Sequence, residues 1–257
     1  MEMIRTVAKA WNIPDIRKKI IFTLVMLLIF RIGSQIPVPG IDRDILAQTF
    51  DSGTGLFALF NLFSGGAFSN FTIFALSITP YITASIILQL LTIAVPSLER
   101  LAKEGTEGRK KIAQYTRYLT VILAIIQAIG VSVGLFRQAL ISTSFFDVAV
   151  IVLVLTAGTA FLMWLGEQIN EYGIGNGISL IIFAGIVSRL PSAVQEIWTK
   201  LQDGSMSIVT LIIFLIFCVL VIVGIIEVQQ GQRRIPVQYA KRVVGRKMYG
   251  GQATHIP

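Results

Sequence analysis

Long apolar runs, separated by short polar segments, dominate the chain. About 20 apolar residues are needed to cross the hydrocarbon core of a bilayer, and most of the runs approach or exceed that length. We therefore expect six membrane-spanning helices, with approximate bounds 20–36, 71–95, 118–136, 148–165, 178–187 with its flanks, and 208–226. This pattern predicts an all-α polytopic membrane protein.

A shorter apolar piece precedes the second run. Leu56 to Phe63 would form about two helical turns, too few to cross a bilayer, and Ser64-Gly65-Gly66 ends the piece. A backbone broken at membrane depth is tolerated only where it is buried in protein or lines a watery cavity. A half-helix beside a full span therefore indicates a cavity within the helical bundle.

The composition agrees with a membrane protein and changes the meaning of the positive charge. The chain is 54% hydrophobic and 14% charged, with a mean hydropathy of +0.75, and its net charge is +8. In a soluble protein that charge would suggest nucleic acid, but here the basic residues cluster between the spans. The only cysteine, Cys218, lies within the sixth span, so we interpret it as a packing residue rather than a disulfide or metal ligand.

The basic clusters also predict the orientation. The segment before the first span, the segment after the second and the tail after the sixth together hold 17 of the 22 lysines and arginines. By the positive-inside rule these segments, and both ends of the chain, are cytoplasmic. We accordingly divide the chain into a cytoplasmic amino-terminal segment (1–19), five spans with the half-helix (20–191), an exterior loop with span six (192–227), and a basic cytoplasmic loop (228–257).

The residues needed for catalysis are missing from the predicted spans. The sequence has no phosphate-binding Gly-x-x-x-x-Gly-Lys-Ser/Thr loop, its only histidine is His255 in the tail, and no Asp or Glu lies in mid-span. We therefore expect no catalytic residue, no metal site and no cofactor, and favour a passive pore or a scaffold driven by a partner. Arg31 lies inside the first span, where it is either functional or snorkels to the nearby outer surface.

Several longer motifs occur in an order found in a known family. They are Arg31-Ile32-Gly33-Ser34, Ile36-Pro37-Val38-Pro39-Gly40, Asn61 to Ala67, Pro80-Tyr81-Ile82, Gln114 to Tyr118, Trp164 to Gly177, and Gly231-Gln232-Arg233-Arg234. The chain therefore resembles the SecY family of protein-conducting channels, in which two halves of five spans are inverted repeats around a pore. The resemblance implies that this chain ends between spans six and seven, and that it is a fragment or one piece of a split subunit.

The resemblance assigns roles to individual residues. The family's plug, which closes the pore from outside, corresponds to residues 55–70, and the plug residues are Leu56, Phe57, Phe60, Asn61, Phe63, Ser64, Gly65 and Gly66. An apolar pore ring corresponds to Ile78, Ile82, Ile178 and Ile182. Such a ring fits the physics of a dewetted constriction, although isoleucine in membrane helices usually faces lipid or core. Gln89 and Gln127 match polar positions of the lateral gate, with ordinary interhelical hydrogen bonding as the alternative.

The implied partners are SecE and SecG, the SecA ATPase, the ribosome, signal peptides and unfolded polypeptides, lipids, and the carboxyl-terminal half of the same subunit. The docking residues for the motor partners are Arg109, Lys110, Lys111, Arg233, Arg234, Lys241, Arg242, Arg246 and Lys247, unless these residues only fix the topology. The resemblance implies a multi-pass protein of the cell inner membrane with a cytoplasmic amino terminus. Ser77 stands where the family commonly has glycine, and Tyr172 and Gln230 where a basic residue is usual. A secondary transporter or a membrane assembly scaffold remains an alternative.

Overall fold

The structure, a computed structural model, describes residues 13–42, 45–46, 61, 64–142, 144–232, 235–237, 242–244, 247–249 and 254–256. The chain divides into two compact units, Met1–Ala193 and Val194–Pro257. The helices are α2 (Pro14–Gly33), α5 (Thr79–Ala94), α6 (Pro96–Lys103), α7 (Thr106–Ile129) with its π-helical extension η1 (Gly130–Leu135), the short 3₁₀ turn η2 (Arg137–Ala139), α8 (Phe145–Tyr172), α9 (Gly177–Val187), α10 (Leu190–Gln202) and α11 (Ile208–Gln230).

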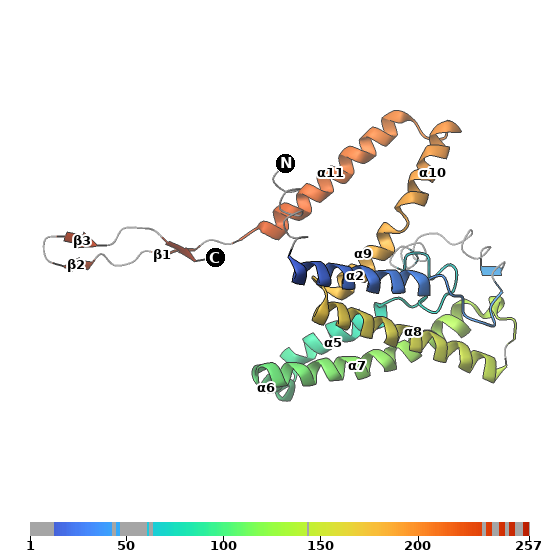
Figure 1. Cartoon of the computed structure of the whole chain (residues 1–257), viewed down its shortest axis with the longest axis horizontal. Coiled ribbons are helices and arrows are strands. Elements are labelled where there is room, and N and C mark those ends of the chain that lie inside the picture. Colours follow the sequence, from blue (N-terminus) through green and yellow to red (C-terminus); the bar gives the residue numbers. More distant parts are fainter. Residues whose placement is uncertain are drawn as a thin grey trace. The chain divides into compact units, whose positions relative to one another are not determined.

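Helix α8 is the centre of the first unit. Helices α2, α7 and α9 all pack against it, and α5 packs on α7, so that these helices lie side by side (Figure 1). Ten residues of α8 are buried, among them Leu155, Leu162 and Ile169. The all-α membrane fold predicted from the apolar runs is confirmed for this unit.

The second predicted span begins later than the hydropathy indicated. We expected a helix from Phe71 to Val95, but residues 64–78 form consecutive turns and α5 starts only at Thr79. Phe71 and Ser77 have φ angles of +43° and +52°, which an α-helix cannot contain, and Pro80 lies in the first turn of α5, where its missing N–H costs nothing. The apolar run is therefore divided between an irregular segment and a helix.

Two predicted loops are helical instead. The segment 96–117, expected to be a cytoplasmic loop, consists of α6, a turn at Glu104–Gly105 and the start of α7. Gly105 allows this turn because its φ is +76°, and α6 leaves α5 at an angle of 100°. The exterior loop expected at 192–207 contains α10, which is helical to Gln202 and carries an exposed Glu196–Lys200 pair four residues apart.

Not every predicted span passes a test of length and apolarity by itself. Four helical stretches of the described part do so, Thr106–Gly134, Phe145–Tyr172, Gly177–Gln202 and Ile208–Gln230, and a bent fifth if α5 and α6 are counted together. Helix α5 has only 16 residues, and α2 carries charged side chains near both ends. The six expected spans therefore correspond to six helices, of which α2 and α5 fall below the threshold.

The second unit contains α11 and a tail with short strands. All described apolar side chains of α11 are at least partly exposed, as expected of a helix whose surroundings are lipid or other protein. The tail, expected to be only a basic loop, forms β1 (Ile235–Val237) paired antiparallel with β4 (Thr254–Ile256), and β2 (Arg242–Val244) paired antiparallel with β3 (Lys247–Tyr249). Valine, isoleucine and tyrosine in these segments favour strands.

Candidate functional site

The four isoleucines assigned to the pore ring lie in one apolar cluster. Ile78 precedes α5, Ile82 follows one turn later, and Ile178 and Ile182 occupy the same spacing on α9. Ile78 is buried, whereas the other three are half-buried against side chains of α2 and α8 such as Phe30, Leu162 and Ile169. The structure thus brings together isoleucines that are 100 positions apart in the sequence. They form an aliphatic surface on which three of the four side chains are partly exposed.

A tight turn between α8 and α9 positions two of these isoleucines. Asn176 caps α9, and its Oδ1 accepts hydrogen bonds from the N–H groups of Ile178 and Ser179 at 3.1 and 3.3 Å. The Asn170 side chain accepts another from Gly177 N–H at 2.7 Å. Because Gly177 lies directly against the backbone of α8, a Cβ there would overlap the carbonyl of Gly166. The start of α9 is therefore fixed to α8 at close range.

The segment after the predicted half-helix is held by its own hydrogen bonds. Gly66 N–H donates to the carbonyl of Asn61 at 3.0 Å, and Phe68 N–H donates to Ser64 Oγ at the same distance. Ser69 N–H donates to Asn61 Oδ1 at 3.2 Å. We call the described residues 61 and 64–72 the plug base, after the plug predicted from the sequence. Of the predicted plug residues, Asn61, Ser64, Gly65 and Gly66 belong to it, while Leu56, Phe57, Phe60 and Phe63 lie outside the described residues.

The plug base is attached to the end of α2. Val38 N–H donates to the carbonyl of Phe71, and Ile73 N–H donates to that of Ile36, both at 3.0 Å. These bonds flank an isolated antiparallel bridge between Pro37 and Thr72. The chain following α2 and the chain preceding α5 thus form a short two-stranded connection at this end of the bundle.

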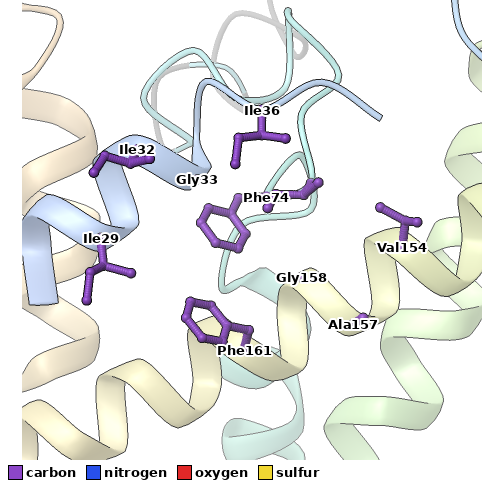
Figure 2. Close-up of a pocket in the computed structure, with 10 residues that line it drawn as sticks. Ile29, Ile32, Gly33, Ile36, Phe74, Val154, Ala157, Gly158 and Phe161 are labelled. Atoms are coloured by element: carbon purple, nitrogen blue, oxygen red, sulfur yellow. The ribbon is translucent and has the colours of Figure 1, made fainter. Parts of the chain in front are cut away.

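Phe74, which directly follows this two-stranded connection, packs its side chain between α2 and α8. Its ring stacks on Phe30 at 6.1 Å and on Phe161 at 6.0 Å between ring centres. Figure 2 shows Phe74 pointing between Gly33 of α2 and Gly158 of α8, beside an apolar pocket of about 470 Å³. A Cβ on Gly33 would overlap this ring, and one on Gly158 would overlap the carbonyl of Ile73. Two glycines therefore allow the segment to pass between the helices.

Arg31 contacts the plug base. It lies in the last turn of α2, and its Nη1 donates a hydrogen bond to the carbonyl of Gly65 in the plug base at 3.2 Å. A guanidinium that donates to an uncharged carbonyl inside the bundle forms one of the stronger hydrogen bonds available to a protein. The geometry favours the functional reading of this intramembrane cation.

Comparison with known proteins decides the family. The sequence profile of the SecY family matches residues 72–257. The chain belongs to the SecY family. The protein translocase subunit SecY of Halalkalibacterium halodurans is 52% identical over 264 residues, which cover 99% of this chain and 61% of that protein. SecY of Escherichia coli K12 is 47% identical over 252 residues, covering 96% and 57%.

A solved SecY structure has the same fold. That structure belongs to a study of the SecY plug domain, which stabilises the closed state of the translocation channel and maintains a membrane seal. It superposes on this chain with a TM-score of 0.62 at 20% sequence identity. The match covers 94% of this chain and 52% of that one. This chain thus spans about three fifths of the length of its curated SecY relatives and about half of the solved SecY chain.

The two glutamines assigned to the SecY lateral gate are placed differently from each other. Gln89 is exposed on α5, whereas Gln127 on α7 lines an apolar pocket of about 370 Å³ together with Phe68 and Leu76. Within the described part of the chain, neither glutamine side chain hydrogen-bonds to a neighbouring helix. Gln127 therefore presents an amide to a largely apolar hollow next to the plug base.

The basic residues assigned to docking fall into two groups. Arg109, Lys110 and Lys111 are exposed in the first two turns of α7, where Lys110 pairs with Glu107 at 2.9 Å. In the tail, Arg242 and Lys247 begin β2 and β3. Arg233, Arg234, Lys241 and Arg246 lie outside the described residues. The α7 group is therefore presented by a rigid helix rather than by the loop we expected.

Two charged contacts escaped the sequence analysis. Arg117 Nε donates to Glu167 Oε1 at 2.7 Å and joins α7 to α8, although the two residues are 50 positions apart. Arg189, which follows the end of α9, lies beside Gly66 of the plug base. The available signal for Arg189 was a cation directly after the apolar run 178–187. Among the described residues no three His, Cys, Asp or Glu side chains are close enough to hold a metal ion.

Proposed function

We propose that the chain forms the amino-terminal half of a protein-conducting channel, which passes unfolded polypeptides across the cytoplasmic membrane and releases apolar segments sideways into lipid. One observation carries this proposal. The isoleucines of α5 and α9 lie in one aliphatic cluster next to a hydrogen-bonded plug base. A narrow aliphatic constriction dewets and so blocks ions, while flexible side chains can still seal around a passing chain.

The plug and the lateral gate extend the same proposal. Residues 55–70 would close the constriction from outside, and the short plug base, tied to the end of α2, would act as the attachment about which the plug moves. Gln89 and Gln127 would line the side opening on the helices α5 and α7, which pack against each other. The other wall of that opening would come from the carboxyl-terminal half of the subunit.

The proposed partners follow from the exposed charge and from the absence of an ATP-binding loop in the sequence. SecA or a translating ribosome would supply the driving force and dock on the basic residues of α7 and the tail, and ribosomal RNA would bind there with strong salt dependence. SecE and SecG would complete the complex. The channel would lie in the cell inner membrane, and by the positive-inside rule its amino terminus would be in the cytoplasm.

Reconstitution tests this function. The complete subunit that contains this sequence is placed in proteoliposomes with SecE and SecG, and SecA, ATP and an unfolded preprotein are added. We expect the preprotein to become protected from protease, and we expect single-channel conductance to rise when residues 56–63 are deleted. A transporter would instead accumulate a small solute, and a scaffold would neither protect the preprotein nor conduct after the deletion. Either result would contradict the proposal.

A further inference from the structure

Two arginines from different helices meet the glycine turn of the plug base. Arg31 comes from the last turn of α2 and donates to the carbonyl of Gly65 at 3.2 Å. Arg189 follows the end of α9, and its Nη2 lies 2.9 Å from the point that a Cβ on Gly66 would occupy. Both side chains belong to half-buried residues. The turn is thus contacted from α2 and from the end of α9.

The turn itself fits this place only as two glycines. Gly65 and Gly66 have φ angles of +63° and +93°, in the left-handed region that side chains rarely adopt. Gly65 also lies directly on α9, because a Cβ on it would be 2.7 Å from the Cα of Gly185. The turn is therefore in close backbone contact with α9, accepts a hydrogen bond from Arg31, and has the Arg189 guanidinium beside Gly66.

The charges of the two arginines are not neutralised by carboxylates within the described part of the chain. The four ion pairs there use other lysines and arginines, and neither Arg31 nor Arg189 is among them. A half-buried guanidinium has five donors and needs oxygen acceptors. The carbonyl of Gly65 is the acceptor that Arg31 has found, so loss of this bond would leave that cation less well satisfied.

We propose that Arg31 and Arg189 form a clamp that holds the plug base in the closed channel and that releases the plug when α9 moves. This inference rests on the proposed channel function and deepens it. Both residues are positioning residues, because they act on the plug and not on the passing polypeptide.

The position of Ile182 explains how the clamp would open. On α9 the predicted ring residue Ile182 precedes Gly185 by three residues and Arg189 by seven, so all three move together if the helix shifts as a unit. A polypeptide that widens the ring by displacing α9 from α2 withdraws the Gly185 backbone and the Arg189 side chain from the turn, while Arg31 stays on α2. Entry of a substrate at the ring is thereby coupled to release of the plug.

Thiol labelling of the plug base tests the clamp. Ser64 is 1% exposed, and cysteine is nearly its isostere, so Ser64→Cys reports opening of the plug base. The variant is made in the complete subunit with its partner subunits, with Cys218→Ser and any other cysteine replaced, and a membrane-impermeant maleimide is added from outside to resting vesicles. We expect Arg31→Gln and Arg189→Gln each to raise the labelling rate about tenfold, which corresponds to about 1.4 kcal/mol.

The double variant and two controls separate the clamp from a general loss of structure. If both arginines act on one turn, the double variant labels more slowly than the product of the single effects predicts. Arg100→Gln, at an exposed arginine of α6 that the whole length of α5 separates from the plug base, should label at the parent rate. If Arg31→Gln is not recovered as a folded complex, Arg31→Lys is measured instead. Lysine keeps the positive charge but lacks the planar guanidinium with its several N–H donors, so we expect the Arg31→Lys variant to be labelled faster than the parent.

The outcomes distinguish the clamp from the channel function. If the parent subunit fails to transport a preprotein, the proposed function fails, whatever the labelling rates are. If the parent transports normally and the variants at Arg31 and Arg189 label at the parent rate, the clamp is wrong and the channel function stands. Independent, fully multiplicative effects of the two substitutions would also overturn the clamp, since they would show that the arginines do not act on a common turn.

Discussion

Replacing two ring residues by polar ones tests the seal. Ile82 and Ile182 are half-buried members of one apolar cluster on α5 and α9. In the double variant Ile82→Asn with Ile182→Asn, two amides replace aliphatic groups at the constriction. Leaving an amide without a hydrogen-bond partner costs about 1–3 kcal/mol, so two amides favour entry of water by about 2–6 kcal/mol. Because 1.4 kcal/mol is a factor of ten, we expect water occupancy, and with it the resting leak of small ions, to rise at least about tenfold.

The assay is the decay of a potassium diffusion potential in vesicles that contain the complete subunit. Two controls accompany it. Ile82→Val with Ile182→Val keeps the ring aliphatic and should retain the seal. Ile93→Asn makes the same chemical change on α5 about three turns away, at a side chain that is 81% exposed, and should not leak. Equal decay rates for the double asparagine variant and the wild type would refute the ring assignment.

Three further predictions concern other parts of the chain. Residues 1–257 alone should not export a preprotein, and co-expression with the remaining carboxyl-terminal half should restore export. Efficient export by residues 1–257 alone would contradict this prediction. The double substitution Arg246→Glu with Lys247→Glu should weaken ribosome binding and SecA-driven transport. It should not change the membrane topology, because the earlier spans set the orientation. Unchanged ribosome binding in a sedimentation assay would show that these residues act only as topology signals. Ser77→Gly should raise the thermal unfolding midpoint, since a side chain at φ +52° costs about 1–2 kcal/mol, and a lower midpoint would show that the Ser77 side chain stabilises the turn.

Hydropathy located the helices well where a span is continuous. The fifth apolar run, 178–187, differs from α9 by a single residue. The second run was misjudged because apolar content does not report φ. Residues 71–78 are as apolar as the helix that follows, and only the positive φ angles at Phe71 and Ser77 separate the two.

Contacts between distant residues could not be inferred from local patterns. Arg31 and Gly65 are 34 positions apart, and the local sequence around either residue gives no indication that the two are in contact. The same holds for the insertion of Phe74 between α2 and α8, which depends on glycines in both helices. The start of α7 was missed for a different reason. Its first turns are charged and solvent-exposed, so a hydropathy criterion reads them as a loop although their helix is continuous with the apolar span.

Photocrosslinking from within the ring tests the central claim most directly. A photoreactive amino acid is placed at Ile82 or Ile182 of the complete subunit, and at Ile93 as an exposed control on α5, and a preprotein is arrested during SecA-driven transport. We predict that the arrested polypeptide crosslinks to positions 82 and 182 and not to position 93. An arrested polypeptide that crosslinks to neither ring position would show that polypeptides do not pass this constriction, and would contradict the account.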